Sequence, residues 1–518
     1  MNWLHRPALA AWRDSGLLAA ALGALQTLAF VHTAAWPLPL LAIAWLVHWL
    51  DRARPGRAAW LAWCFGVGWL VAGTWWLFVS MHRYGQLPAP LAAAGVLALA
   101  AALSLYLALA GGLYARWRSA GAWRNALLFA ALWLLAELAR GVLFTGFPWV
   151  ASGYAQIDGP LALLAPWVGV YGMGAVLAFA AARLAGIGGW PWRAGLVGLA
   201  LLAAAVPRSA WLGPDFTRPH GTPLALTLIQ PNVAQDEKFA LERMPQALEW
   251  LAQAMTSARG PLVVGPETAI PLLPGQLDDF DAAYWPALRR HFAAGQRAAL
   301  IGLPLGDFSA GYTNSVAGLG GAAPYRYDKH HLVPFGEFIP SGFRWFTKMM
   351  QIPLGDFSRG LVDAPSFEAL GQRLAPNICY EDLFGEELAV RFRDAAKAPT
   401  VMVNLSNIGW FGPTVAVPQH LNISRLRTLE LQRPMLRATN TGATAVIDHR
   451  GAVTAQLPAF TRGTLDAQVQ GRSGTTPFAA WAAHAGLWPL GLLALLMIGL
   501  GGRGLKGQAG PAAPAAPP

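Results

Sequence analysis

The chain has 518 residues, of which 55% are hydrophobic and only 13% charged, and its formal net charge is +11. Soluble globular proteins carry about 25% charged residues, so this composition excludes an ordinary soluble protein. The positive charge does not indicate nucleic-acid binding, because no basic run with interleaved aromatic residues occurs. The 24 tryptophans are typical of a chain that crosses many membrane–water interfaces.

Acidic residues divide the chain into two regions. Residues 1–212 contain only Asp14, Asp51, Glu137 and Asp158, whereas acids are common from residue 215 to about 466. We therefore predict a membrane domain over residues 1–212 and a water-facing domain over residues 215–475. The tail at 507–518 consists almost entirely of Ala, Pro and Gly, and we expect it to be disordered.

Seven apolar segments precede the water-facing domain, each near the ~20 residues that a helix needs to cross a bilayer. They lie at about 15–34, 37–50, 59–80, 88–114, 125–145, 160–183 and 193–210, and an eighth lies at 478–500. The sequence thus predicts about eight transmembrane helices. The first resembles a signal peptide, but the apolar segments continue without a pause, so we expect it to stay uncleaved. The break at Trp36-Pro37 is either a tight turn or a re-entrant hairpin.

Basic residues in the short loops predict the orientation, because they gather on the cytoplasmic side. The loops on one side contain Arg6, Arg13, Arg52, Arg54, Arg57, Arg116, Arg118, Arg124, Arg183, Arg193, Arg503 and Lys506. The opposite loops hold little beyond Arg83. Both termini are therefore expected in the cytoplasm. An odd number of crossings then places residues 215–475 in the periplasm of a Gram-negative cell, with the helices in the inner membrane.

Residues 222–470 alternate between short apolar runs and helical patterns. We expect strands at 223–229, 261–265, 298–302, 315–320, 325–328, 373–378, 400–405, 443–448 and 452–456. Helices are expected at 239–258, 279–294, 383–392 and 419–436. Fully apolar strands separated by helices are typical of a sheet covered by helices, so the fold class is an α/β layered domain on a polytopic helical membrane protein.

Cys379 is one of only two cysteines, and it follows an expected strand and precedes a helical pattern. Backbone N–H groups at a helix start stabilise a thiolate. An exported domain with one cysteine cannot form an internal disulfide, and its thiol risks oxidation. A buried structural cysteine is the alternative, but this location favours a nucleophile. Cys64 lies in the third apolar segment, where we expect it to serve packing.

Glu267 and Lys329 also follow expected strands. Strand ends are where sites assemble in α/β sheets, so separation along the chain does not prevent these residues from meeting Cys379. A cysteine nucleophile needs a base for its proton and a donor for the oxyanion, and these two side chains fit those needs. By position alone, a solvated loop acid and a surface lysine are the stronger interpretations.

Three motifs change that balance: residues 265–269 (GPETA), 327–337 (YDKHHLVPFGE) and 377–382 (NICYED). In this order they resemble the motifs of the nitrilase superfamily, which uses a Glu–Lys–Cys triad on an αββα sandwich. Several predicted transmembrane helices precede these motifs, and a chain that joins such helices to a nitrilase-like domain resembles the apolipoprotein N-acyltransferases. The resemblance covers nearly the whole chain and includes residues 145–149 (TGFPW) and 406–412 (SNIGWFG).

The resemblance implies a reaction and a role for each residue. Cys379 would take an acyl chain from the sn-1 ester of a phospholipid, typically phosphatidylethanolamine, and pass it to the amino group of diacylglyceryl-cysteine in an apolipoprotein. Glu267 would be the general base and Lys329 the oxyanion stabiliser, alone or with the backbone N–H of Tyr380. The supporting residues would be Glu337, Tyr380 and Glu381, and the substrate-binding or lid residues would be Phe239, Trp410 and Phe411.

Neither a cofactor nor a metal ion is expected, because the sequence contains no glycine-rich nucleotide loop and His330-His331 lack partners at zinc spacing. Two positions depart from the family pattern. Phe239 stands where tryptophan is usual, which removes an indole N–H, and Ile408 stands where aspartate is usual, which removes a carboxylate.

Several alternatives remain open at this level. A membrane-anchored amidohydrolase would use the same triad on a small amide, and a transporter or receptor would only bind. Glu137 and Arg140 share a helix face and are expected to pair or to face a cavity, as a structural ion pair or a lipid-headgroup contact. The loop at 343–357 either dips into the bilayer as a lid or packs on the domain's own helices.

Overall fold

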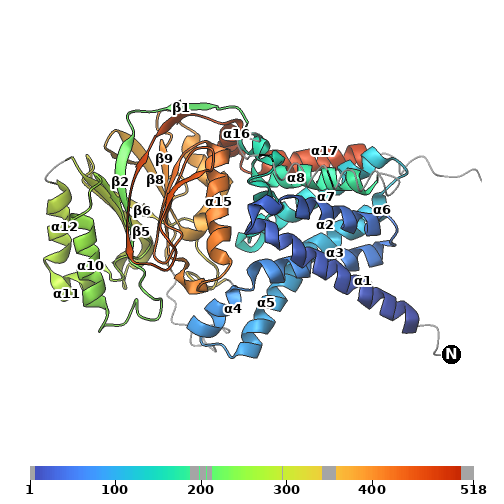
Figure 1. Cartoon of the computed structure of the whole chain (residues 1–518), viewed down its shortest axis with the longest axis horizontal. Helices are drawn as coiled ribbons and strands as arrows, with labels where there is room; N and C mark the ends of the chain where they lie inside the picture. Colours follow the sequence, from blue (N-terminus) through green and yellow to red (C-terminus); the bar gives the residue numbers. More distant parts are fainter. Residues whose placement is uncertain are drawn as a thin grey trace, which may run out of the picture.

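The computed structural model describes residues 6–186, 213–293, 296–340 and 357–502, with the isolated positions 198 and 206. A bundle of helices leads into an α/β domain, and the chain then returns to the bundle (Figure 1). Three predictions fall wholly or almost wholly outside these residues: the seventh apolar segment at 193–210, the loop at 343–357 and the tail at 507–518.

The helical bundle contains most of the predicted apolar segments, but several are broken. Its helices are α1 (Arg6–Leu25), α2 (Pro37–Leu50), α3 (Pro55–Thr74), α4 (Leu77–Val79), α5 (Ala89–Leu103), α6 (Leu105–Trp117), α7 (Ala122–Val142), α8 (Ala165–Ala185), α16 (Pro477–Ala485) and α17 (Trp488–Gly502). Short turns join them: η1 (Gln26–Phe30), η2 (Thr33–Ala35), the π-helical η3 (Ser80–Tyr84), η4 (Leu143–Thr145), η5 (Ser152–Gln156) and η6 (Pro160–Leu164).

By length and apolarity, four helical stretches of the described residues are able to cross a membrane, or six if each bent pair counts as one span. The bends are 61° between α3 and the helix that follows it, and 95° between α16 and α17. The apolar segment expected at 15–34 is a shorter apolar helix, Ser15–Phe30, in which η1 follows α1. The prediction of a polytopic helical membrane protein is confirmed, with four to six candidate spans in the described residues, which do not cover the seventh of the roughly eight expected segments.

The α/β domain contains two six-stranded sheets. The first has the order β13-β2-β3-β4-β5-β6 and the second β12-β11-β10-β9-β8-β7. The first consists of β2 (Leu224–Gln230), β3 (Leu262–Val264), β4 (Ala298–Asp307), β5 (Gly311–Leu319), β6 (Tyr325–Asp328) and β13 (Gly463–Val469). The second consists of β7 (Phe367–Ala369), β8 (Gln372–Ile378), β9 (Val401–Ser406), β10 (Met435–Thr439), β11 (Ala445–Ile447) and β12 (Val453–Gln456). A separate pair joins β1 (Thr217–Pro219) to β14 (Arg472–Gly474).

The two sheets pack face to face, and helices cover their outer faces. One apolar core combines residues of both sheets, such as Leu228 and Val264 with Ile378 and Leu405. A second core joins the first sheet to α10 (Met244–Thr256), α11 (Pro274–Asp281) and α12 (Tyr284–Ala293). The central strands of both sheets are parallel and almost entirely buried, as expected of strands covered on both faces, although they carry polar residues such as Asn404 and Arg437. The α/β prediction is confirmed as a four-layered sandwich.

Four helix predictions need correction. The helix expected at 419–436 is α15 (Ala416–Leu431), which ends at the left-handed Gln432; Pro434 cannot continue a helix, and β10 follows. The helix expected at 279–294 is divided into α11 and α12. Pro286 has no N–H to donate to the carbonyl group one turn earlier, so a continuous helix is not favoured there. The helix expected from 239 begins only at Met244. The helix expected at 383–392 is replaced by short turns around α14 (Gly385–Ala389).

Helix α15 lies between the second sheet and the helical bundle (Figure 1). Its apolar residues Ile423, Leu426 and Leu429 belong to the same core as the bundle helices α7 and α8. Tyr380, Leu383 and Phe384, which follow β8, also belong to that core. The carboxyl end of β8, with Cys379, is therefore held directly against the membrane part of the protein.

Candidate active site

Cys379 stands on a sharp turn where β8 ends and the five-residue 3-10 helix η8 (Cys379–Leu383) begins. Its backbone is left-handed, with φ of 51°, a strained conformation for a residue with a side chain. Two side chains fix the turn by donating to the Cys379 carbonyl oxygen, His420 Nε2 and Asn404 Nδ2, each at 3.2 Å. The turn thereby holds the thiol clear of the sheet.

The Cys379 thiol is not the activated thiolate that the sequence indicated. Burial raises its pKa to about 12, and the nearby Glu267 charge adds to this rise, while Lys329 and the Ser406 hydroxyl oppose it. The expected helix start is also missing, because η8 is a single short turn and contributes little dipole. Cys379 is therefore a neutral thiol at neutral pH, and its reaction requires a base within reach.

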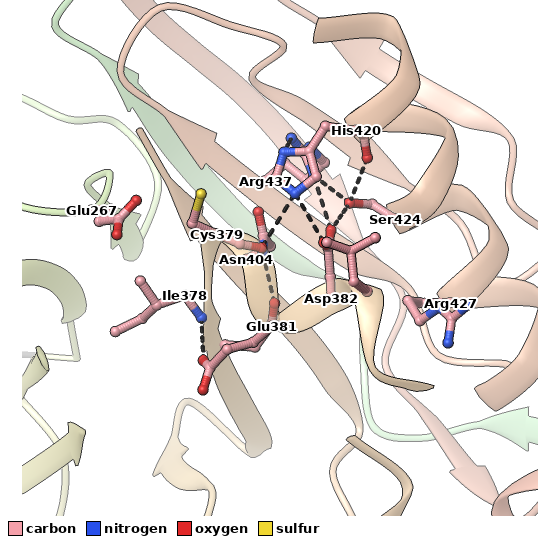
Figure 2. A network of polar contacts seen from close by, with 12 residues as sticks. Glu267, Ile378, Cys379, Glu381, Asp382, Asn404, His420, Ser424, Arg427 and Arg437 are labelled. Atoms are coloured by element: carbon pink, nitrogen blue, oxygen red, sulfur yellow. Dashed lines mark hydrogen bonds and ion pairs between the residues drawn. The ribbon is translucent and has the colours of Figure 1, made fainter. Parts of the chain in front are cut away.

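Glu267, which follows β3, provides a carboxylate near the Cys379 thiol (Figure 2). Its Oε2 accepts a hydrogen bond from the backbone N–H of Asn407 at 2.8 Å, and its Oε1 accepts one from Asn314 Nδ2 at 2.7 Å. Oε1 also lies 3.5 Å from Lys329 Nζ. These contacts orient the carboxylate beside the thiol, whose pKa it raises.

Lys329 follows β6 and is almost completely buried between two carboxylates. Its Nζ lies 2.9 Å from Glu337 Oε1 and 3.5 Å from Glu267 Oε1. Burial alone would lower the pKa of the lysine, but Glu337 and Glu267 outweigh it and raise the pKa above its ordinary value. The ammonium therefore stays charged, which suits a donor to an oxyanion and excludes Lys329 as a base.

Asn314, on β5, was missed by the sequence analysis. Its Nδ2 donates to Glu267 Oε1 at 2.7 Å and to Glu337 Oε1 at 2.8 Å. It thereby holds the two carboxylates on either side of Lys329. An asparagine inside a strand has no sequence signal for such a role, because only the register of β5 brings it to the site.

Glu381 connects the cysteine turn to the lysine loop. Its carboxylate accepts hydrogen bonds from the backbone N–H groups of Ile378 at 2.6 Å and His330 at 2.7 Å, and from the Tyr327 hydroxyl at 2.7 Å. The Tyr380 hydroxyl donates to the Gly146 carbonyl at 3.0 Å, which joins the same turn to the helical bundle. The predicted supporting residues Glu337, Tyr380 and Glu381 thus all contact the triad or the segments that carry it.

The three aromatic residues predicted near the site lie in different surroundings. Phe411 packs on Trp76 with ring centroids 4.2 Å apart, and Trp410 packs edge-on against Tyr84 at 5.6 Å. Both belong to η10 (Ile408–Phe411) and contact the helical bundle. Phe239 is 55% exposed and stands apart from them on the segment that precedes α10.

A buried polar network beneath the cysteine turn also escaped the sequence analysis (Figure 2). His420 Nε2 lies 2.9 Å from Asp382 Oδ1, and His420 Nδ1 lies 3.2 Å from an Arg437 nitrogen. Arg437 only donates, so Nδ1 accepts, and Nε2–H donates to Asp382 and to the Cys379 carbonyl. Burial acts to raise the pKa of Asp382, but His420, Arg437 and Ser424 hold it below its ordinary value. The network therefore fixes the tautomer and the position of His420, which holds the cysteine turn through its hydrogen bond to the Cys379 carbonyl oxygen.

Glu137 and Arg140 form a buried ion pair in α7, with Arg140 NH2 3.4 Å from Glu137 Oε1. Glu137 also accepts from the Ser152 N–H and hydroxyl, each at 2.7 Å, and Arg140 donates to the Trp149 carbonyl at 2.7 Å. The pair also lines a small pocket among the bundle helices. The prediction that these residues pair or face a cavity is confirmed on both counts.

Within the described ranges, no three His, Cys, Asp or Glu side chains gather in a way that could hold a metal ion. The charged groups that act most strongly on the Cys379 thiol are Glu267, Lys329 and Glu337. A buried thiol, an adjacent carboxylate and a fixed cation are the parts that acyl transfer through a covalent intermediate requires.

Comparison with known proteins matches both parts of the chain. A family model for the apolipoprotein N-acyltransferase N-terminal domain matches residues 22–183, and one for carbon-nitrogen hydrolase matches residues 225–478. A protein named apolipoprotein N-acyltransferase from Verminephrobacter eiseniae (strain EF01-2) is 54% identical over 92% of this chain and 94% of its own length. Similarly named proteins from Ralstonia nicotianae (48%, covering 91% and 90%) and Bordetella bronchiseptica (43%, covering 93% and 96%) also match.

Proposed function

The chain belongs to the apolipoprotein N-acyltransferase family, and from this premise we propose that it transfers a phospholipid acyl chain to a diacylated apolipoprotein through a thioester on Cys379. As a member of this family, the protein is a bacterial membrane acyltransferase that acts in the N-acylation of lipoproteins. The observation that carries the proposed mechanism is the position of Cys379, next to Glu267 and beside the membrane helices.

In the first half-reaction, Glu267 takes the thiol proton while Cys379 Sγ attacks the carbonyl carbon of the sn-1 ester. A C–S bond forms, and the negative charge moves to the carbonyl oxygen, where the Lys329 ammonium and a backbone N–H such as that of Tyr380 stabilise it. The C–O bond then breaks, and Glu267 returns the proton to the glycerol oxygen. The products are an acyl thioester and a lysophospholipid.

In the second half-reaction, the α-amino group of diacylglyceryl-cysteine attacks the thioester carbonyl. Glu267 now accepts a proton from the amine, the C–S bond breaks, and the proton returns to the sulfur. This order makes the reaction ping-pong, because the lysophospholipid leaves before the acceptor reacts. A thioester is a more reactive acyl donor than an amide, so the transfer proceeds without ATP.

The proposal includes an arrangement in the cell. Residues 1–212 would form the membrane domain, residues 215–475 the catalytic domain and residues 478–500 the last transmembrane segment. The excess of basic residues in one set of loops supports a catalytic domain in the periplasm and both termini in the cytoplasm. Phosphatidylethanolamine and the diacylated acceptor would then both lie in the leaflet that the site faces. Phe239, Trp410 and Phe411 would contact the lipids or close over them.

Mass spectrometry of the intact protein tests this function. After incubation with phosphatidylethanolamine, we expect an increase in mass equal to one fatty acyl group on Cys379. A diacylated lipopeptide should discharge the adduct quickly, whereas water should discharge it slowly. If water clears the adduct at the same rate, or if the adduct never forms, the protein acts as the alternative amidohydrolase and the proposed transfer is wrong.

Asn314→Ala is expected to slow acylation of Cys379 by about 10- to 100-fold, because it removes hydrogen bonds to two charged groups, each worth about 1.5–3 kcal/mol. Without the amide, Glu267 and Glu337 are held only by Lys329 and by backbone N–H groups. The measurement is the single-turnover rate of adduct formation. Gln246→Ala, which removes an exposed side-chain amide on α10, is the control. An unchanged rate in Asn314→Ala would show that the carboxylates need no bridge.

A further inference from the structure

Lys238 is a second buried lysine near the triad, and it differs from Lys329 in its partners. Only 7% of Lys238 is exposed. Among the described residues, its only hydrogen-bond partner is the backbone carbonyl of Glu267, 3.2 Å from Nζ, and no carboxylate forms an ion pair with it. Removing a cation from water costs several kcal/mol unless an anion compensates it. An unpaired buried lysine at an active site therefore indicates that the anion arrives with a ligand.

The surrounding segment holds Lys238 firmly over the site. Gln235 accepts a hydrogen bond from Asn407 Nδ2 at 2.8 Å, and the backbone N–H of Val233 donates to Asn440 Oδ1 at 3.0 Å. Asp236 forms an ion pair with Arg83 of the helical bundle at 3.1 Å. The acids next to Lys238 therefore point away from it, because Asp236 is engaged by Arg83 and Glu237 is exposed.

Lys238 also lines a small open pocket together with Glu267, Thr268 and Asn440, and the other lining residues are apolar or proline. Burial lowers the pKa of Lys238 to about 8, although Glu267 and Cys379 act to raise it, so its charge lies within range of the reacting groups. The lysine remains mostly protonated at neutral pH, and a bound anion would keep it so.

We propose that Lys238 binds the phosphate of the phospholipid acyl donor, an inference that rests on the function proposed above. In a glycerophospholipid, the sn-1 ester and the phosphate are carried by the two ends of one glycerol. When the ester carbonyl lies at Cys379, the phosphate therefore lies only one glycerol away. A residue that borders the reacting groups, as Lys238 does, is then in a position to contact it. Lysine binds phosphate as a point charge and needs no bidentate geometry. The diacylglyceryl-cysteine acceptor has no phosphate, so this contact belongs to the first half-reaction only.

The test compares two donors on the full-length enzyme in detergent micelles. Phosphatidylethanolamine and a diacylglycerol with the same acyl chains differ only in the phosphate headgroup. In Lys238→Met, we expect acylation of Cys379 by phosphatidylethanolamine to slow by about 10- to 100-fold, as for the loss of one hydrogen bond to a charged group. Acylation by diacylglycerol should slow much less, since it is affected only by the lost contact between Lys238 and the Glu267 carbonyl. Lys238→Arg should recover most of the loss, and Lys397→Met, which removes an exposed lysine, should match the wild type.

Equal slowing with both donors would overturn the assignment, because Lys238 would then act on the chemistry and not on the headgroup. No slowing with either donor would overturn it as well. If inorganic phosphate raises the wild-type rate with diacylglycerol to that with phosphatidylethanolamine, the site takes free phosphate and the headgroup assignment is wrong. If the wild-type enzyme forms no adduct from either donor, the proposed function fails and this assignment fails with it.

A second measurement on the wild-type enzyme does not depend on the folding of a variant. A diether analogue of phosphatidylethanolamine keeps the phosphate but has no ester to react. We expect it to protect Lys238 from acetylation by an amine-reactive reagent, as read by peptide mass spectrometry, while Lys397 is labelled equally with and without it. Equal labelling of Lys238 in both samples would contradict phosphate binding.

Discussion

Cys379→Ala is expected to abolish both the acyl adduct and transfer to a diacylated lipopeptide. The thioester is the only bond through which the acyl chain passes from donor to acceptor in the proposed mechanism, so no slower route remains. Both effects are measured with phosphatidylethanolamine as donor, the adduct by intact mass and the transfer by the mass of the lipopeptide. The loss should be complete within the limit of detection.

Cys64→Ala is the matched control for this experiment, since Cys64 is the only other cysteine and is buried in α3 within the helical bundle. It should keep the adduct and the transfer activity of the wild type. Transfer that persists in Cys379→Ala would exclude a cysteine intermediate and would point to direct attack of the amine on the phospholipid ester.

The sequence predicted the parts of the site that motifs carry. Glu267, Lys329 and Cys379 each follow a strand, as expected, and the two sheets bring these strand ends to one place. The helix expected after Cys379 was wrong, because the acids of that stretch serve other purposes. Glu381 accepts hydrogen bonds from backbone N–H groups of the cysteine turn and of the loop that carries Lys329. Asp382 pairs with His420 and Arg437.

The residues that sequence reasoning missed act through contacts between distant strands and helices. Asn314 reaches both carboxylates from β5, and Lys238 reaches the Glu267 carbonyl across 29 positions of the chain. His420 has the sequence signal of an ordinary residue in a helical pattern that was itself predicted too long, and Arg437 lies just beyond the end of that predicted helix. Periodicity reports which residues face a core, but it does not report which buried polar groups meet there.

The membrane part shows the same limit. Hydropathy identified apolar segments, yet it did not locate the breaks between α3 and α4 or between α16 and α17. The first break matters for the site, because Trp76 lies in it, directly before α4. Trp76 and Trp149 both donate hydrogen bonds to Gln419 Oε1 of α15. Trp149 also stacks on His420, with ring centroids 5.5 Å apart. The bundle therefore packs directly against the group that holds the Cys379 turn, and it supports the turn as well as anchoring the domain.

Glu267→Gln is expected to slow acylation of Cys379 by about 10²- to 10⁴-fold at neutral pH, the usual contribution of a positioned base. Glutamine has nearly the same shape, and its oxygen keeps one of the two hydrogen bonds that orient Glu267, from Asn314 or from the Asn407 backbone. It does not accept the thiol proton. The thiol must then ionise to solvent, and burial, the largest cause of the rise to about 12, keeps its pKa above neutral even though the contribution of the Glu267 charge is lost.

The pH dependence separates loss of the base from a damaged site. Below the thiol pKa, the thiolate fraction rises about tenfold for each pH unit, so the residual rate of Glu267→Gln should rise with the same slope. The measurement is the single-turnover rate of adduct formation between about pH 6 and pH 7.5, below the pKa of about 8 of Lys238, so that this lysine stays charged throughout. Glu242→Gln, which alters an exposed acid on the segment before α10, should follow the wild type throughout. A residual rate that does not change with pH would mean that Glu267 positions the lipid and that another group takes the proton.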